Sequence, residues 1–427
     1  MNILVISNTP WSDNNSFGNS FSNIFKGIPD INFANVYCRA GEPNNQFPMV
    51  FFQITEKSLM KNLFHREYPS GSMVLPSNKK QIEEKEILGF EQARKMRWQV
   101  MFWGRNLIWK IGRWKSDELK MFLSDFKPDI IFQPIYSKSY INDIVLYAKD
   151  FVGCPMIGYI SDDNYTLKQF RFSPLYWIDR LFSRRKVKLV VEKCEILYVI
   201  SKIQKEEYEK IFTPVCKILT KCADFSKQAP NWNLPGKTVD FIFAGNIGAG
   251  RWRSLGLISK AIEKLRGDGY GVELNIYTST PMTKKIRSAL EYNGTFIHDP
   301  IPYQQIIERQ KKADVVIHVE GLSKKSQMEV HQSFSTKLVD YFMLGKCIVA
   351  VGTEYEASIQ HLKENDAAVV IEAAKDVLPQ LKELLDDPEK ILLYGQKAYN
   401  CGKKHHDQAS IKNMVMTDIR KIVGKYS

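Results

Sequence analysis

The feature that most constrains the fold of this 427-residue chain is a regular alternation of short apolar runs with helical segments. Residues 2–7 form the first apolar run. A polar loop, a helix from about Ser20 to Lys26, and a strand-like alternating segment at 31–38 then follow. Strand, loop, helix and strand in this order open a doubly wound α/β domain. Further buried strands of this domain are expected at 130–132, 155–160 and 196–200.

A second block of the same kind begins after residues 226–238, which contain two prolines and a glycine and are typical of a linker. The expected fold class is therefore α/β, with two doubly wound, Rossmann-like domains. We expect the domains to span 1–228 and 238–405, with a C-terminal helix at 406–427 that packs back on the first. The strands of the second domain are expected at 239–244, 272–277, 295–298, 314–319, 347–351 and 367–371. Residues 48–92 are mixed and polar and predict an insertion.

The composition excludes several classes of protein. Hydrophobic residues make up 44% of the chain and charged residues 25%, as is usual for a soluble globular protein. No apolar run approaches the roughly 18–20 residues of a membrane span, and residues 1–7 lack the features of a signal peptide. The seven cysteines are scattered and never in C-x-x-C spacing. This pattern indicates reduced thiols and a cytoplasmic chain, without a zinc site.

The net charge of +13 predicts an anionic partner: nucleic acid, a phosphorylated small molecule or an anionic membrane surface. Two segments, 93–115 and 171–188, combine basic with aromatic residues, and the first contains seven Lys or Arg and four of the eight Trp. Such a helix is typical of the surface of anionic lipid, which would place the chain peripherally on the inner face of the plasma membrane. The alternative is a core-packing helix whose basic residues face water. Nucleic acid is not expected, because no nucleic-acid-binding motif accompanies these segments.

The stretch from Ser333 to Val351 contains a complete loop, helix and strand. Ser335 and Thr336 are good N-cap residues, Gly345 suits the helix C-terminus, and Cys347–Val351 has the length and apolarity of a buried parallel strand. A helix N-terminus beside Lys337 is a ready site for an anion, usually phosphate. The alternative is an ordinary αβ unit with a solvated lysine.

A glycine-rich loop, with Gly245, Gly248 and Gly250, follows the first strand of the second domain and leads into Arg251 and Arg253. Glycine allows a phosphate to approach the backbone closely, and guanidinium groups suit phosphate oxygens. The order is G-x-x-G-x-G rather than G-x-G-x-x-G. In addition, the next strand does not end on the acidic residue that binds a nicotinamide or flavin dinucleotide, so such a cofactor is not expected.

Two other polar segments follow strands of the first domain, at the edge where ligands bind in such sheets. Asp162 and Asp163 could act as a base or bind a polar acceptor, or could cap the next helix. The Asn-, Ser- and Gly-rich loop at 8–19 is a candidate for function, with a plain surface loop as the alternative.

Taken together, the two domains, the linker and the phosphate-type loop resemble the GT-B glycosyltransferases, and most closely their retaining family 4. The resemblance covers nearly the whole chain in architecture and is most specific at 239–255 and 313–351. That family carries two glutamates eight positions apart in a segment similar to 332–350, and here Gln332 and Asp340 stand in their places. The acceptor-side histidine common in the family is replaced by Ser161 and Asp162.

The resemblance implies a hexosyltransferase whose N-terminal domain binds an acceptor and whose C-terminal domain binds a nucleotide-diphosphate sugar, favoured to be a UDP-sugar, across a cleft. The implied acceptor is a lipid-linked or cell-surface polysaccharide precursor, as in capsule synthesis. Transfer would proceed with retention and with neither a metal nor another cofactor, because protein cations stabilise the leaving diphosphate. The alternative, motivated by Gln332, is a non-catalytic GT-B-like subunit that binds a nucleotide sugar or regulates a partner.

The same resemblance implies roles for individual residues. Asp340 would accept from the ribose hydroxyls of the donor, the N–H groups around 336–338 would hold its diphosphate, and Arg251 or Arg253 would neutralise it together with Lys337. The catalytic candidates are Arg251, Lys337 and Asp163. The donor-binding candidates are Gly245, Asn246, Gly248, Arg253, Pro302, Tyr303, Glu320, Gln332, Phe334, Ser335, Thr336, Leu338 and Asp340. The acceptor-side candidates are Asn14, Gly18 and Asp162.

Overall fold

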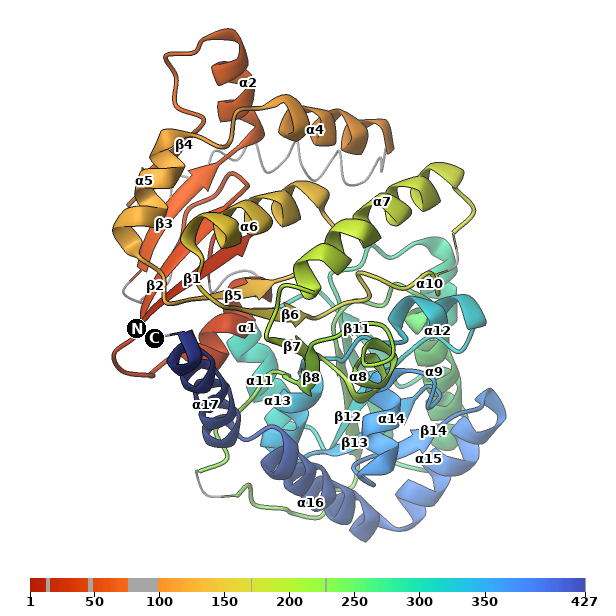
Figure 1. Cartoon of the computed structure of the whole chain (residues 1–427). Coiled ribbons are helices and arrows are strands. Elements are labelled where there is room, and N and C mark those ends of the chain that lie inside the picture. The colour runs from red at the N-terminus through yellow and green to blue at the C-terminus, as the bar shows by residue number, and fades with distance from the viewer. Residues whose placement is uncertain (13–15, 45–48, 76–98, 170, 227–228, 427) are drawn as a thin grey trace.

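The computed structural model describes residues 1–12, 16–44, 49–75, 99–169, 171–226 and 229–426. Its strands form two sheets, one of eight strands in the order β4-β3-β2-β1-β5-β6-β7-β8 and one of six in the order β11-β10-β9-β12-β13-β14. All neighbouring strands among the described residues pair in parallel, except the antiparallel pair β3 and β4. The predicted fold class, α/β with two doubly wound domains, is confirmed (Figure 1).

The first sheet is covered by helices on both faces. Alternate side chains of β1 point to opposite faces, so that Leu4 and Ile6 pack with α4 to α7 while Ile3 and Val5 pack with α1 and the C-terminal helix α17. The strands are β1 Asn2–Ser7, β2 Asn32–Tyr37, β3 Met49–Ile54, β4 Gly71–Val74, β5 Ile130–Pro134, β6 Met156–Ile160, β7 Ile196–Val199 and β8 Val215–Ile218. The helices are α1 Ser16–Phe25, α2 Glu56–Phe64, α4 Gln99–Ile111, α5 Asp117–Phe126, α6 Ser139–Val152, α7 Pro174–Val191 and α8 Lys202–Tyr208.

Several elements of this domain differ from the prediction. The segment at 48–92 is not simply an insertion, because β3 joins the sheet beside β2 and β4 forms its edge. The first helix begins at Ser16 rather than at about Ser20. The short strand β8 and the helices α5 and α8 have no counterpart in the prediction. Of the basic, Trp-rich segment at 93–115, residues 93–98, which include Trp98, lie outside the described residues.

The second sheet has the strand order of dinucleotide-binding domains. Its switch point lies between β9 and β12, because β10 and β11 are added on one side of β9 and β12, β13 and β14 on the other. Its strands are β9 Val239–Ala244, β10 Val272–Tyr277, β11 Thr295–His298, β12 Val315–Val319, β13 Cys347–Val351 and β14 Val369–Ile371. Its helices are α9 Arg251–Gly267, α10 Lys284–Leu290, α11 Tyr303–Lys312, α12 Lys324–Val330, α13 Lys337–Leu344, α14 Ala357–Glu364, α15 Val377–Asp386 and the 3-10 turn η1 Ala374–Asp376.

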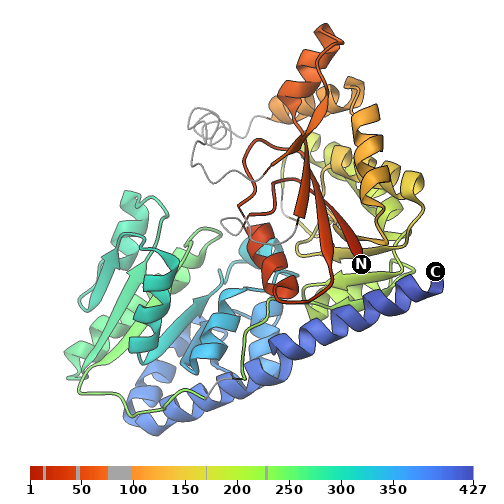
Figure 2. The same cartoon turned by 90° about the vertical axis from the view of Figure 1, so that its left-hand side faces the viewer.

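The C-terminal helices link the two domains. Helix α16, Pro388–His405, belongs to the second domain, whereas α17, Gln408–Tyr426, runs along the first (Figure 2). Ile411, Val415 and Ile419 of α17 are buried in the core of the first domain. Asp418 accepts a hydrogen bond from the Tyr198 hydroxyl at 2.6 Å. The carboxyl ends of β6 and β7 in turn face the second domain, since the Ser201 Oγ donates to the Gln332 carbonyl at 2.8 Å.

None of the helices in the described part of the chain combines the length and hydropathy that a bilayer crossing requires.

Candidate active site

The site is built at the switch point of the second sheet, where β9 and β12 end side by side. The loop after β9 turns into α9, with Gly250 at φ +84° and Ala249 at φ +52°, and brings Arg251 to the first position of the helix. Glu320 follows β12 directly and is 3% exposed. Arg251 meets it with two hydrogen bonds, from Nε to Oε2 at 2.9 Å and from a terminal nitrogen to Oε1 at 3.2 Å. A bidentate pair of this kind fixes the direction of the guanidinium.

Lys337 reaches the same place from the start of α13. Its Nζ donates to the Ala244 carbonyl, the last of β9, at 2.8 Å. Gly245 has φ +145°, and a Cβ built on it would lie 1.8 Å from the Lys337 Nζ. Gly245 is therefore required twice, because its backbone conformation suits glycine alone and because the ammonium occupies the position of a side chain.

The site holds a surplus of positive charge. Glu320 pairs with Arg251 and Asp340 pairs with Lys221, which leaves Lys337 without an ion-pair partner among the described residues. Burial and the nearby Arg251 lower the pKa of Lys337 to about 8, although Glu320 and Asp340 act in the opposite direction. An anion placed here would satisfy Lys337 and restore its ordinary pKa.

His318, at the end of β12, does not add to this charge. Burial, Arg251 and Lys337 together lower its pKa to about 3, so the imidazole is neutral at physiological pH.

A second polar group lies one turn further along α13. Asp340, which is 7% exposed, accepts from the Lys221 Nζ at 2.5 Å and from the hydroxyl of Tyr303. The Lys221 ammonium also lies 5.8 Å from the centre of the Tyr303 ring. The structure thus brings Asp340 and Tyr303 together, as the assignment of both to the donor site requires. Sequence reasoning missed Lys221, which follows β8 of the first domain and belongs to no motif.

The N-terminus of α13 offers two backbone donors. The N–H groups of Thr336 and Lys337 have no acceptor among the described residues, as expected for the first turn of a helix. By contrast, Ser335 N–H donates to the Ser358 Oγ at 2.9 Å, and Leu338 N–H donates to the Ser335 carbonyl at 3.1 Å. Of the N–H groups at 336–338 that were predicted to hold the diphosphate, those of Thr336 and Lys337 are therefore available to a ligand, and that of Leu338 is not.

Some predicted donor residues have other contacts. Phe334 is 7% exposed and its ring packs 5.4 Å from that of His406, while Leu338 is fully buried. This packing does not support assigning either side chain to the donor. Arg253 is exposed and its guanidinium lies 4.4 Å from the centre of the Trp252 ring, whereas Arg251 meets the buried Glu320. Of the two arginines between which the sequence left the choice open, the geometry favours Arg251.

Asn246 and Pro302 complete the donor-side set. The Asn246 Oδ1 accepts from the Gly248 N–H at 2.6 Å and shapes the glycine loop. Pro302 precedes Tyr303 as the exposed N-cap of α11.

Gln332 lies at the contact between the domains. It is 2% exposed, and its Nε2 donates to Glu207 Oε2 of α8 at 2.6 Å. Glu207 also meets the His331 Nε2 at 2.9 Å and the Lys168 Nζ at 2.5 Å. A neutral amide at position 332 suits this arrangement, because a glutamate would place two carboxylates in contact.

On the acceptor side, the two neighbouring aspartates are in different surroundings. Asp163 accepts from the Thr166 N–H at 2.7 Å and pairs with the buried Arg180 at 3.0 Å. These contacts favour a structural role for Asp163 in the turn after β6 over its assignment to catalysis. Asp162 is exposed and its carboxylate reaches the side chain of Ser333 in the second domain.

The first loop is described only in part. Gly18 is buried in the first turn of α1, where a Cβ would lie 2.1 Å from the Ser12 carbonyl oxygen. Asn14 lies outside the described residues.

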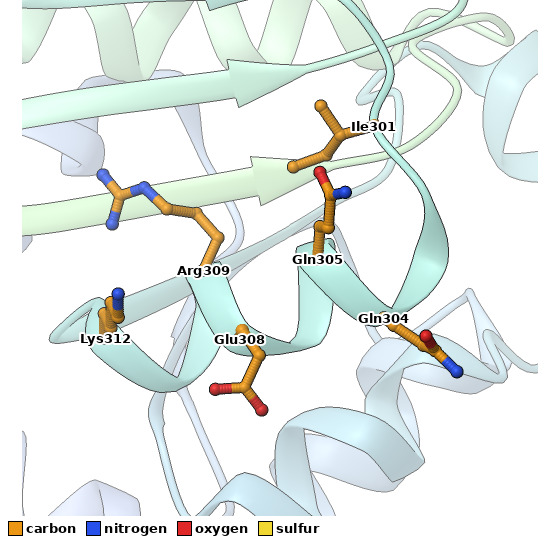
Figure 3. A pocket seen from close by; sticks show the side chains of 6 residues that line it. All are labelled: Ile301, Gln304, Gln305, Glu308, Arg309 and Lys312. Atoms are coloured by element: carbon orange, nitrogen blue, oxygen red, sulfur yellow. The ribbon is translucent and has the colours of Figure 1, made fainter.

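Two hollows of the surface are lined by other residues than Arg251 and Lys337. The first, of about 320 Å³, lies along α11, and Figure 3 shows Ile301 and Gln305 pointing toward each other while Gln304 and Glu308 point outward. The second, of about 730 Å³, lies at the edge of the first sheet and includes residues of α2, β4 and α5. Neither contains Arg251 or Lys337, so we do not assign the donor to either.

Solved structures share this fold over nearly their whole length. Anabaena HepE in complex with UDP has a TM-score of 0.64 at 9% identity, covering 99% of this chain and 100% of that one. Sucrose-phosphate synthase from Thermosynechococcus elongatus has a TM-score of 0.61 at 11% identity, covering both chains completely. The E. coli trehalose-6-phosphate structure bound with UDP-2-fluoro glucose has a TM-score of 0.60 at 10% identity and covers 99% of each chain. No protein-family model matches the sequence, and a search of curated proteins finds no significant match. At these identities the likeness shows the architecture, and the chain therefore has the GT-B fold.

Proposed function

We propose that this protein is a glycosyltransferase that moves a hexosyl group from a UDP-sugar to an acceptor held by the first domain. The observation that carries the proposal is the convergence of Arg251 and Lys337 beside Gly245, at the switch point of the second sheet. Lys337 is a half-buried ammonium without a counter-ion among the described residues. Such a cation, next to free N–H groups of a helix N-terminus, is suited to a diphosphate. Solved structures of the same fold include complexes with UDP and with UDP-glucose, which favours UDP as the nucleotide.

The proposed roles follow from the charges. Arg251 and Lys337 would stabilise the negative charge that develops on the leaving UDP, the electrostatic contribution that commonly dominates such catalysis. In this scheme the transfer proceeds with retention and needs no metal, since protein cations neutralise the diphosphate. Asp340 would exchange its contact with Lys221 for the ribose hydroxyls, and Tyr303 would lie near the nucleobase. Asp162 is the better placed of the two aspartates to meet the acceptor.

We further propose that the acceptor is a lipid-linked or cell-surface polysaccharide precursor, as in capsule synthesis, and that the protein meets it as a peripheral protein on the cytoplasmic side of an anionic membrane. Helix α7 supports this, because Phe182 is 62% exposed and Leu189 51% exposed beside the exposed Arg185 and Lys188. An exposed apolar surface flanked by cations is suited to anionic lipid. Of the segment at 93–115, by contrast, Trp109 and Trp114 are buried, as the core-packing alternative expects.

Vesicle co-sedimentation tests the membrane proposal. The protein should bind vesicles that contain phosphatidylglycerol and not those of phosphatidylcholine alone. Phe182→Glu should abolish this binding, whereas Leu393→Glu, at a position of α16 that is 46% exposed, should not. Equal binding by the two variants would contradict the proposed role of α7.

The transferase activity is tested with a panel of UDP-sugars, by following the slow release of UDP and by mass spectrometry with candidate acceptors. We expect UDP to raise the unfolding temperature, at least one UDP-sugar to be hydrolysed, and Lys337→Met to weaken both effects. Binding of UDP without any hydrolysis or transfer would instead favour a non-catalytic nucleotide-sugar-binding subunit. Failure to bind UDP would refute both functions.

A further inference from the structure

The first domain has a switch point of its own, between β1 and β5, and it also gathers cations. β2 lies on one side of β1 and β5 on the other, and all three strands run parallel, so the residues that follow them lie at one edge of the sheet. Asn8 follows β1, Arg39 follows β2 and Lys138 follows β5 as the N-cap of α6. No sequence motif marks any of the three as a binding residue, although Asn8 begins the candidate loop at 8–19.

Neutral polar groups hold Lys138 in place. Its Nζ donates to the Asn8 Oδ1 at 2.9 Å, and the Tyr140 hydroxyl donates to the same oxygen at 3.0 Å. In the part of the chain that the structure describes, no carboxylate lies within ion-pair distance of Lys138. An ammonium has three N–H donors, so at least one remains to meet a ligand.

The surroundings of Lys138 are positive. Arg105 of α4 lies 5.5 Å from the centre of the Tyr140 ring, and its Nε lies 3.9 Å from a carboxylate oxygen of Glu56. The Trp109 Nε1 donates to the same oxygen of Glu56 at 3.1 Å. Arg39 and Arg105 both act on Lys138, whereas Glu56 supplies the opposing carboxylate and Cys38 is a buried thiol. Asp179 of α7 also interacts electrostatically with Arg105.

The titration of Lys138 reflects this environment. Burial, and then Arg39 and Arg105, lower its pKa to about 7, although Glu56 and Cys38 act in the opposite direction. The pKa values of Tyr136 and Tyr140 are raised by burial, so both hydroxyls are neutral hydrogen-bond donors at physiological pH.

We propose that the cluster of Asn8, Arg39, Arg105 and Lys138 binds an anionic group, a phosphate or a carboxylate, carried by the acceptor. The identification of the bound molecule as the acceptor rests on the proposed transferase function. The position fits, because the same edge of the first sheet carries Asp162 and Ser201, which contact the second domain at Ser333 and Gln332. Donor and acceptor would thus each be held by cations at a sheet switch point.

Calorimetric titrations of the full-length protein, saturated with UDP to occupy the donor site, test this inference. Glycerol 3-phosphate represents the phosphate source and glucuronate the carboxylate source, and we expect at least one of them to bind. Lys138→Met should weaken this binding at least tenfold. Lys186→Met, which removes a half-exposed lysine that pairs with Asp143 at 2.5 Å, should leave it unchanged.

Proton uptake provides a second readout, which a merely structural lysine would not show. At pH 8 the free Lys138 is mostly neutral, so an anion that raises its pKa must draw a proton from the buffer. Titrations in buffers of different ionisation enthalpy should show this uptake in the wild type. They should show none in Lys138→Arg, which retains the charge and should retain binding. Thermal unfolding and circular dichroism would verify that both variants fold.

The outcomes separate the two proposals. If neither anion binds, or if Lys138→Met binds as the wild type does, the inference is wrong even when UDP binds and turns over. If the protein does not bind UDP, the proposed transferase function is refuted. The same anion titrations on Lys337→Met without UDP still decide whether the Lys138 cluster is an anion site.

Discussion

Gly245→Ala is the change that probes the donor site most directly, because it adds one methyl group where Lys337 now lies. The new Cβ would lie 1.8 Å from the Lys337 Nζ, and alanine would have to adopt φ +145°. A backbone conformation of this kind costs a non-glycine residue about 1–3 kcal/mol. The ammonium must also leave the Ala244 carbonyl, now 2.8 Å away, and a charge-assisted hydrogen bond contributes about 1.5–3 kcal/mol. We therefore expect the free energy of unfolding to fall by about 3–5 kcal/mol.

Gly245→Ala should also weaken the binding of UDP. If Lys337 contributes about 2 kcal/mol to the binding of UDP, its displacement weakens the affinity roughly 30-fold. Denaturant unfolding and UDP titration measure the two effects. Gly269→Ala is the matched control, because Gly269 has φ +94° and nothing within 4 Å of a built Cβ. It should cost only about 1–2 kcal/mol of stability and leave UDP binding intact.

A double-mutant cycle with Lys337→Ala isolates the contact. Without the lysine, Gly245→Ala should cost only the backbone strain, about 1–3 kcal/mol, and should cause no further loss of UDP affinity. The two changes would then be non-additive by about 2 kcal/mol. Additivity to within about 0.5 kcal/mol would show that Lys337 does not lie over Gly245 and would refute the reasoning.

Three further predictions concern the charges of the site. The affinity for UDP should fall as the pH rises above about 8 in the wild type and not in Lys337→Met. The reason is that the folded pKa of Lys337 is lowered from 10.5 to about 8, so that its ammonium is lost in that range. UDP titrations from neutral to alkaline pH measure this, and identical pH profiles of the two proteins would exclude Lys337 as the binding cation. Arg251→Gln should lower the free energy of unfolding by about 3–5 kcal/mol, since the buried Glu320 loses its partner, and should also lower the affinity for UDP. Arg253 is exposed, so Arg253→Gln should change stability by less than about 0.5 kcal/mol. The same denaturation and binding assays measure both variants. Gln332→Glu, which installs the glutamate common in family 4, should destabilise the protein by about 2–4 kcal/mol without raising turnover, because the Gln332 Nε2 now lies 2.6 Å from the Glu207 carboxylate. Adding Glu207→Gln should restore most of the stability in denaturant unfolding. A gain in turnover would instead mean that position 332 acts on the donor.

Local sequence predicted those elements whose physical cause is local. Cys347–Val351 was predicted as a strand over its full length, since a parallel strand covered on both faces must be apolar throughout. Gly345 was predicted to end α13, and its φ of +60° is the left-handed conformation for which glycine is preferred. The prediction was wrong at Met49–Ile54, where five of six residues are apolar within polar sequence, because only pairing with β2 makes this segment a strand of the sheet.

The candidate site was predictable as a set of residue types and not as a set of contacts. The glycine loop, Arg251 and the start of α13 have sequence signals, and the strand order places them together. The choice between Arg251 and Arg253 depends on Glu320 and Trp252, with which the two side chains meet. Whether Phe334 faces a ligand or the core depends on His406, which lies beyond the end of α16.

The sequence alone determined the alternation of strands and helices, the two-domain organisation of the α/β fold and the glycines that the tight turns require, because these follow from periodicity and backbone conformation between near neighbours. Only the tertiary structure decided the pairs that set the charge of each site. Lys221 meets Asp340 across 119 residues of sequence, and Lys138 meets Asn8 across 130. Whether a lysine is paired with a carboxylate or is left to bind an anionic ligand depends on such distant pairs, and no local sequence pattern encodes it.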